Sequence, residues 1–170
     1  PFAHSTWMTS MDDATLIELS AEETYDLRRR VLRVGTPSTD VQWQGDSLDT
    51  TTHLGVSGTD KIVAISTWLK SQSPDLDRHH AGVQLRGMAT DPAARGHGYG
   101  SMLLLAGIDR ARRSGAHHAW ANARTATLNF YIAHGFKVTS SELENAETAI
   151  PHRRILMYLP SPTDTKLLEL

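Results

Sequence analysis

The sharpest signal in the sequence is the stretch Asp91-Pro92-Ala93-Ala94-Arg95-Gly96-His97-Gly98-Tyr99-Gly100, which lies between a predicted strand and a predicted helix. Its glycines let the backbone approach a ligand closely, because no Cβ stands in the way. The helix that begins near Gly98 offers unpaired N–H groups and the positive end of its dipole, and Arg95 adds a cation at the rim. These features predict an anion site suited to a phosphate or pyrophosphate. A helix start that is merely rich in glycine is the structural alternative, and the stretch by itself leaves it open.

The elements around this stretch follow a mixed pattern. A strand at 81–88 leads into it, and Asp91-Pro92 stops that strand. A helix at 98–114 follows and ends at Gly115, a residue suited to the turn after a helix. The order of strand, helix, three strands, helix, strand, helix and two strands predicts a mixed α/β (α+β) domain. The other predicted elements are strands at 14–19, 52–57, 61–69, 117–123, 136–139 and 152–159, and helices at 21–34 and 125–134.

The predicted helices carry local signals. Ser20 and Glu23 form a capping box, in which the hydroxyl and the carboxylate each bond a free backbone N–H. Residues 28–30 are three arginines, a pattern more typical of a solvated helix face than of a nucleic-acid site. In the helix 98–114 one apolar side carries Met102, Leu105 and Ala106, and Leu104, Ile108 and Ala111 lie beside it.

Two common phosphate-binding motifs do not match. A Rossmann turn needs Gly-x-Gly-x-x-Gly and an acidic residue about 20 positions further on. The glycines here are Gly96, Gly98 and Gly100, and the region 117–122 contains no carboxylate. A P-loop needs Gly-Lys-Ser/Thr, and no lysine lies near the turn. Neither motif is therefore predicted.

The composition excludes several classes of protein. The 170 residues include no cysteine, so disulfides, thiolate zinc sites and a cysteine nucleophile are excluded. With 17 Lys and Arg against 19 Asp and Glu, the formal net charge is -2, without the basic excess typical of nucleic-acid binding. The longest apolar run, 102–107, is far too short to cross a bilayer. We expect a single domain over 1–170, with loose tails at 1–12 and 160–170, and no nucleic-acid or membrane partner.

The histidines do not predict a metal site. There are nine, but His79-His80 and His117-His118 are adjacent pairs, and neighbours on a strand point to opposite faces. No metal is therefore expected. Residues 1–5 lack the basic-then-apolar order of a signal peptide, and the absence of cysteine suits a reducing compartment, so a cytoplasmic location is expected.

Three segments together resemble the GNAT superfamily of acetyl-CoA-dependent N-acyltransferases. Arg95-Gly96-His97-Gly98-Tyr99-Gly100 matches the Arg/Gln-x-x-Gly-x-Gly/Ala turn of that family. Leu85-Arg86-Gly87-Met88-Ala89-Thr90-Asp91-Pro92 is similar to its fourth strand. Phe130-Tyr131-Ile132-Ala133-His134-Gly135-Phe136 is similar to its Phe-Tyr-x-x-x-Gly-Phe segment. The segments follow the order and spacing of the family, and the resemblance covers 15–159.

The resemblance implies a GNAT fold and acetyl-CoA as co-substrate. That fold is a mixed, mostly antiparallel sheet of roughly six to seven strands, flanked by about four helices, whose central fourth and fifth strands splay apart. The pantetheine arm would bond the main chain of Met88, Ala89 and Thr90. The pyrophosphate would be held by Arg95, Gly96, His97, Gly98, Tyr99, Gly100 and Ser101.

The resemblance also implies catalytic residues. Tyr131 falls where the family places the general acid for the departing thiolate, and a phenol with a reference pKa near 10 is roughly matched to a thiol near 8.5. Packing of Tyr131 beside Phe130 is the structural alternative. The sequence departs from the family twice: Arg124 replaces an Asn, and 81–88 contains no carboxylate that could act as base. His152, a water chain or bulk solvent would then take the amine proton, and a surface histidine is the alternative for His152.

The acceptor side carries weaker signals. Trp43, Asp46 and His53 fall where the family builds its acceptor wall, and an Asp could pair there with a cationic amine; a polar loop around one buried aromatic is the alternative. The expected function is transfer of an acetyl group to a primary amine of a small molecule or peptide by direct attack. A non-catalytic acyl-CoA-binding module and a protein-interaction domain with a degenerate site are the alternatives. The resemblance allows a homodimer without locating an interface.

Overall fold

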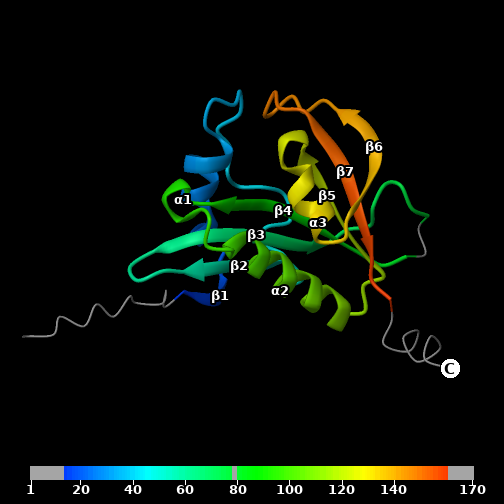
Figure 1. Cartoon of the computed structure of the whole chain (residues 1–170), viewed down its shortest axis with the longest axis horizontal. Helices are drawn as coiled ribbons and strands as arrows, with labels where there is room; N and C mark the ends of the chain where they lie inside the picture. The colour runs from blue at the N-terminus through cyan, green and yellow to red at the C-terminus, as the bar shows by residue number, and fades with distance from the viewer. Residues whose placement is uncertain (1–13, 78–79, 161–170) are drawn as a thin grey trace, which may run out of the picture.

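The computed structural model describes residues 14–77 and 80–160, and within them one seven-stranded sheet forms the centre (Figure 1). The strand order is β1-β2-β3-β4-β5-β7-β6, and only β4 and β5 run parallel. The strands are β1 (Thr15–Leu19), β2 (Thr52–Ser57), β3 (Ile62–Lys70), β4 (Gly82–Thr90), β5 (His118–Arg124), β6 (Lys137–Leu143) and β7 (His152–Tyr158). The predicted mixed, mostly antiparallel sheet is confirmed. The predicted tail 1–12 and nearly all of 160–170 lie outside the described residues.

Helices cover both faces of this sheet. Ala64 and Ile65, neighbours on β3, point to opposite faces and belong to two separate apolar clusters. The larger cluster contains the buried side of α2 (Tyr99–Arg113) and Tyr131 of α3 (Leu128–Ala133). The smaller contains Leu27 of α1 (Tyr25–Leu27). In Figure 1, α1 and α2 accordingly lie on opposite sides of the strands.

The packing of α2 selects one of its two apolar sides. A Cβ on Gly107 would lie 1.8 Å from Cε2 of Trp68, so only glycine allows α2 to approach β3 this closely. The buried side carries Leu103, Leu104, Gly107, Ile108 and Ala111. Met102 and Leu105, which the sequence predicts on the apolar side of the helix, are 37% and 58% exposed. The tight contact with Trp68 therefore sets the rotation of the helix.

The first helical run is less regular than the predicted helix 21–34. It begins as a 3-10 turn (Glu22–Thr24), continues as α1 and ends in a π turn (Arg28–Leu32), where Arg33 N donates to Arg28 O at 3.1 Å. The π turn brings Arg28 and Arg33 inward, and both are buried. The predicted solvated face at 28–30 is wrong for Arg28, whose exposure is 0%.

The predicted capping box is present at the start of this run. Ser20 N donates to Glu23 Oε2 at 2.8 Å, and Glu23 N donates to Ser20 Oγ at 3.3 Å. We expect Ser20→Ala to lower the free energy of unfolding by about 1 kcal/mol, because one backbone N–H at the helix start loses its partner. Urea unfolding measures the change, with Ser47→Ala in an exposed turn as control. Equal stability of the two variants would contradict a stabilising cap.

The centre of the sheet is split, as the resemblance implies. β4 and β5 pair only from Gly82↔His118 to Gln84↔Trp120, and beyond these positions the two strands separate. β5 pairs with β7 along its whole length, from His118 to Arg124, so the gap lies on its β4 side alone. The split leaves residues 85–90 of β4 without a strand partner on that edge.

Candidate active site

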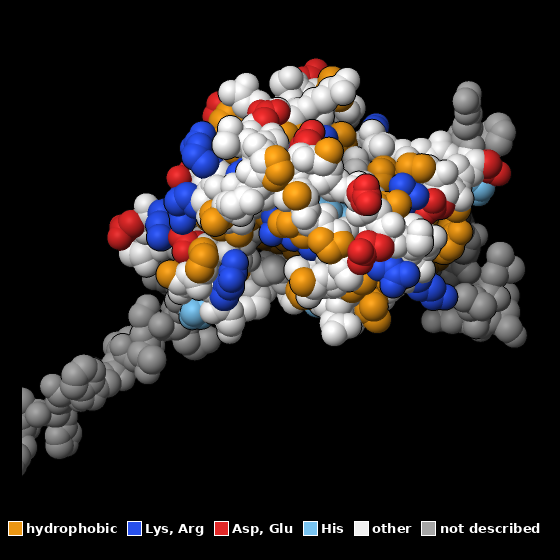
Figure 2. Space-filling view, turned by 90° about the horizontal axis from the view of Figure 1, so that it is seen from above, with side chains coloured by type: hydrophobic (Ala, Val, Ile, Leu, Met, Phe, Trp, Pro, Cys, Tyr) orange, Lys and Arg blue, Asp and Glu red, His pale blue; other side chains and the backbone are white. Residues whose placement is uncertain are grey.

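A cavity of about 560 Å³ opens where β4 and β5 separate. The loop after the first helical run and the loop before β7 meet over it. Ser38 N donates to Glu147 O at 2.9 Å, and Arg33 Nη2 donates to Glu147 Oε2 at 3.1 Å. Figure 2 views the molecule from this side, and basic side chains are seen toward the middle of the face among apolar ones. The cavity is therefore bordered by the split sheet and by these two loops.

The unpaired edge of β4 forms one wall of the cavity. Residues 85–90 all line it, so their free backbone groups are available to a ligand. A bulge interrupts the strand here, because the pairing with β3 shifts between Ile65↔Ala89 and Thr67↔Arg86. Gly87 in the bulge has φ +63°, and a Cβ there would lie 2.8 Å from Cζ3 of Trp43. An extended ligand with amide groups, such as a pantetheine arm, fits an edge of this kind.

The glycine turn at 95–100 leads from β4 into α2. Gly96 and Gly98 have φ of +84° and +79°, and a Cβ on either would meet nothing within 4 Å. Gly98 is the N-cap of α2, a helix of 15 residues, and no side chain caps the first turn of this helix with a hydrogen bond. Open space at the glycines, the backbone N–H groups of a helix start and the helix dipole together fit a phosphate group.

The turn is anchored by Asp91. Its side chain accepts from Ala93 N at 3.0 Å and pairs with Lys61 at 3.1 Å and Arg30 at 3.3 Å. The Ala93 amide, followed by Lys61 and Arg30, holds the pKa of this carboxyl below its usual value. The loop geometry thus stays fixed at neutral pH.

The predicted cofactor residues divide into two groups. Met88, Ala89, Thr90 and Arg95 line the cavity. The side chain of Tyr99 is buried in the core, and the exposed ring of His97 stacks on it at 5.5 Å, so these two residues present their backbone to the turn. Gly96, Gly98, Gly100 and Ser101 form the turn and the first residues of α2.

Tyr131 lies at the inner end of the cavity. Its ring packs against Phe130 and Phe136, with centroids 5.0 and 5.9 Å away, and its hydroxyl lies 3.7 Å from Sδ of Met88. Burial raises the pKa of Tyr131 to about 12, and Arg124 acts in the opposite direction. The hydroxyl is therefore a protonated phenol at any working pH, placed beside the β4 edge.

His152 lines the same cavity and is 8% exposed. Its Nδ1 lies 2.7 Å from the carbonyl oxygen of Ile150, which can only accept, so Nδ1 carries the hydrogen and Nε2 the lone pair. Burial lowers the pKa of His152; the Ile150 carbonyl opposes this and Arg124 adds to it. His152 is therefore a neutral imidazole at pH 7, able to accept a proton through Nε2.

The buried position of His152 leads to a prediction about the pH at which its ring titrates. The ring of His152 should titrate below its reference value of 6.5, since the buried charged form lacks solvation. Histidine-edited NMR measures the midpoint, and the signal is assigned by its loss in His152→Gln. The same protonation should lower kcat/KM in acid, below pH 6.5. A midpoint at or above 6.5 would contradict the lowering of the pKa of His152 by burial.

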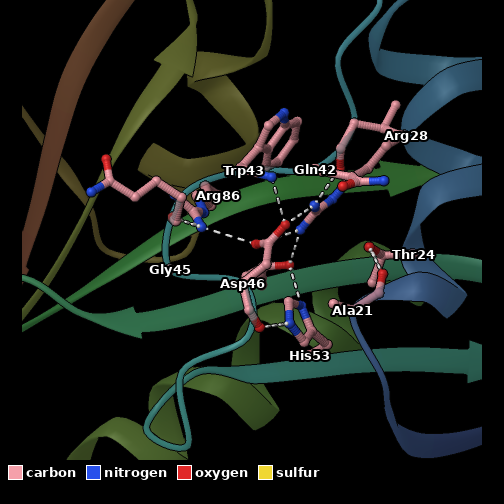
Figure 3. A network of polar contacts seen from close by, with 12 residues as sticks. Ala21, Thr24, Arg28, Gln42, Trp43, Gly45, Asp46, His53 and Arg86 are labelled. Atoms are coloured by element: carbon pink, nitrogen blue, oxygen red, sulfur yellow. Dashed lines mark hydrogen bonds and ion pairs between the residues drawn. The ribbon is translucent and has the colours of Figure 1, made fainter.

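Asp46 lies at the centre of a buried polar network (Figure 3). Arg28 donates to its two oxygens at 2.5 and 3.2 Å, and Arg86 Nη2 donates to Oδ1 at 2.9 Å. Its own carbonyl oxygen accepts from His53 Nε2 at 2.9 Å, while Nδ1 of that ring accepts from Thr67 Oγ1 at 2.8 Å. Arg28, first among the cations, holds the pKa of Asp46 below its usual value against the effect of burial. Pairing of Asp46 with a cationic amine, considered from the sequence, is therefore wrong.

The network was not predictable from the sequence, although it supports the cavity wall. Trp43 lies over the guanidinium of Arg28 at 3.9 Å and donates its backbone N–H to Asp46 at 2.9 Å. Arg86 reaches from β4 to the carboxylate from the opposite side (Figure 3). Trp43 and Arg86 line the cavity, whereas Asp46 and His53 stand behind it.

Arg124, where the sequence departs from the family pattern, also lines the cavity. Its Nη2 donates to Leu32 O at 2.8 Å, so the side chain spans from β5 to the end of the first helical run. Burial, and then the nearby Arg33, lower the pKa of Arg124. No carboxylate among the described residues pairs with it.

Comparison with known proteins agrees with this architecture. The acetyltransferase (GNAT) family model matches residues 19–136. YitI, an uncharacterised N-acetyltransferase of Bacillus subtilis (strain 168), is 30% identical over 119 residues, which cover 70% of this chain and 79% of YitI. An acyl-CoA N-acyltransferase of Pseudomonas aeruginosa superimposes with a TM-score of 0.67 at 21% identity, covering 85% of this chain and 98% of that one. ElaA of Escherichia coli gives 0.68 at 20% identity, covering 84% and 98%.

These matches define the class of the protein as an acyltransferase. The chain belongs to the acetyltransferase (GNAT) family. Within 14–77 and 80–160, no group of three or more His, Asp or Glu side chains could hold a metal ion. No helix in the described part of the chain is long and apolar enough to span a bilayer.

Proposed function

We propose that this protein transfers an acetyl group from acetyl-CoA to a primary amine of a small molecule or peptide. The observation that carries the proposal is the meeting of three features in one cavity. The unpaired β4 edge and Arg95 of the glycine turn line it on the proposed cofactor side, and Tyr131 and His152 line it from α3 and β7. Each feature alone has a structural explanation, whereas their convergence suits an acyl-transfer site.

The cofactor site in this proposal consists mainly of backbone groups. The main chain of Met88, Ala89 and Thr90 would bond pantetheine, because this edge has no strand partner. Residues 95–101 would hold the pyrophosphate through the N–H groups of the helix start, with Arg95 as counter-charge. Bound there, acetyl-CoA supplies an acetyl group activated as a thioester.

Tyr131 and His152 would carry out the two proton transfers of the reaction. His152 accepts the proton of the attacking amine at Nε2, the nitrogen that Ile150 leaves free. Tyr131 holds the proton that the departing thiol takes up. Its pKa of about 12 lies above the pKa of a free thiol. Burial also disfavours a thiolate released beside it and so raises the pKa of the leaving thiol, which narrows the difference between the two pKa values. The acceptor attacks directly, so no covalent intermediate with the protein is required.

Release of free thiol from acetyl-CoA tests the proposal. Primary amines of three kinds are supplied in turn: amino acids, peptides with a free N-terminus, and aliphatic amines. We expect release that depends on the amine, with one acetylated amine detected by mass spectrometry for each thiol. Acetyl-CoA binding without amine-dependent release for any member of the panel would instead indicate a non-catalytic acyl-CoA-binding module.

A further inference from the structure

We propose that the acceptor is an amino acid, bound through its carboxylate by Arg124. This assignment rests on the proposed function, since it names the second substrate of the same cavity. The arrangement that carries it is a half-buried guanidinium without an anionic partner, placed next to the proposed base.

The wall of the cavity carries more cations than anions. Its arginines are Arg33, Arg86, Arg95 and Arg124, and its carboxylates are Asp40 and Glu147. Glu147 pairs with Arg33, and the exposed Asp40 accepts from the backbone of Gln42 at 2.9 Å. Arg95 lies at the glycine turn, where a pyrophosphate would neutralise it. Two arginines remain: Arg124 is opposite His152 in the β5–β7 register, and Arg86 contacts Asp46 behind the wall.

The buried network behind the wall does not remove this charge. Asp46 is one carboxylate between two guanidinium groups, Arg28 and Arg86. Arg28 is fully buried and takes both oxygens, so Arg86 shares an anion that is already paired. The Nε of Arg86 is buried without a partner among the described residues. The deep wall thus stays positive, which disfavours a polycationic acceptor and favours an anionic one.

Arg124 has the strongest need for an anion. The one hydrogen bond that its side chain makes within the described residues goes to the carbonyl oxygen of Leu32, so other donors of the guanidinium remain for a ligand. It is partly withdrawn from water and repelled by Arg33. A buried charge of this kind is costly unless it is paired, and a carboxylate offers a guanidinium two parallel hydrogen bonds.

The position of Arg124 restricts the acceptor further. Arg124 is directly opposite His152 in the β5–β7 register, and facing residues on neighbouring strands share one side of the sheet with Cβ atoms about 4.5–5.5 Å apart. The carboxylate of the acceptor would lie on Arg124 while its amine meets Nε2 of His152. The two groups must therefore be a few bonds apart, as in an α-amino acid. A lysine side chain or a peptide N-terminus does not carry a carboxylate so close to its amine.

The test compares each standard L-amino acid with its own carboxamide as acceptor. We expect the best amino acid to exceed its carboxamide in kcat/KM by about 10-fold to 10²-fold, the range of one hydrogen-bonded charge. The amine of the carboxamide is the less basic of the two, so more of it is neutral near pH 8. A preference for the acid therefore runs against intrinsic reactivity and reports binding of the carboxylate.

Variants of Arg124 locate the effect. Arg124→Gln should bring the acid-to-amide ratio close to one, and Arg124→Lys should retain part of it, since the charge stays but the two-pronged geometry is lost. Arg110→Gln is the matched control, because this arginine pairs with Glu18 on the exposed surface of α2 and should keep the wild-type ratio. Calorimetry with acetyl-CoA shows that each variant is folded and binds its donor.

Three results would overturn the assignment. If carboxamides or aliphatic amines were acetylated as fast as amino acids, the acceptor would not need a carboxylate. This result would still agree with the proposed acetyl transfer. Weakened acetyl-CoA binding in Arg124→Gln, with an unchanged acid-to-amide ratio, would place Arg124 on the donor instead. Absence of thiol release with every amine would overturn the proposed function, and the acceptor assignment with it.

Discussion

Replacing Tyr131 by phenylalanine should lower turnover by about 10²-fold to 10⁴-fold, the usual contribution of a general acid. The substitution removes only the hydroxyl, whose hydrogen-bond partner is Sδ of Met88 at 3.7 Å. The ring contacts with Phe130 and Phe136 remain, so the fold and the affinity for acetyl-CoA should change little. Steady-state thiol release measures turnover, and calorimetry measures the affinity.

Tyr158→Phe is the control for this experiment. Tyr158 ends β7, is 64% exposed and does not line the cavity, so its hydroxyl should contribute nothing to turnover. If Tyr131→Phe turned over as fast as Tyr158→Phe, the thiolate would leave without a proton from Tyr131. The phenol would then be a packing residue of α3.

Replacing Gly98 by glutamate should weaken acetyl-CoA binding by about 10³-fold or more. The new carboxylate would occupy the N-terminal end of α2, where the pyrophosphate is expected, and like charges in contact cost several kcal/mol. A Cβ at this position would meet nothing within 4 Å, so the expected cost to the fold is the strain of the left-handed backbone and not a clash at the Cβ. The negative charge of the new glutamate interacts favourably with the dipole of α2, so this charge does not destabilise the fold. The same charge repels the pyrophosphate of the ligand.

Gly115→Glu controls for backbone strain. Gly115 lies just beyond the other end of α2, has φ +83° and also has open space around its Cβ position. Both variants therefore carry the cost of a left-handed non-glycine residue, about 1–2 kcal/mol, but only Gly98 borders the proposed pyrophosphate site. Calorimetry with acetyl-CoA should show wild-type affinity for Gly115→Glu. Equal affinity in both variants would remove the glycine turn from the cofactor site.

Local signals predicted much of the fold. The strand predicted at 81–88, the helix predicted at 98–114 and the capping box at Ser20 each depend on a few neighbouring residues. The structure confirms all three, with the strand at Gly82–Thr90 and the helix at Tyr99–Arg113. The strand predicted at 136–139 is longer, Lys137–Leu143, because its polar second half is held by pairing with β7, a contact without an apolar signal in the sequence.

The features that the sequence could not indicate depend on contacts between distant elements. Arg28 stands in a run of arginines, and its burial follows from a π turn and from Asp46, 18 residues away. The rotation of α2 depends on the close contact of Gly107 with Trp68 on β3. For the same reason Arg33 and Glu147 were not predicted as cavity residues, since no motif surrounds them. Arg86 lies within the segment that resembles the fourth strand, but that resemblance gives its side chain no role.

Thermal unfolding with acetyl-CoA, free CoA and NADH, each in a separate scan, tests whether the folded protein binds coenzyme A. A ligand at 100 times its dissociation constant stabilises the folded state by about 2.7 kcal/mol, which corresponds to roughly 5–10 °C for a chain of this size. We predict shifts of this order with acetyl-CoA and with CoA, and none with NADH. No shift with either form of coenzyme A would mean that the split sheet and the glycine turn are structural only, and would contradict the proposed acetyl transfer.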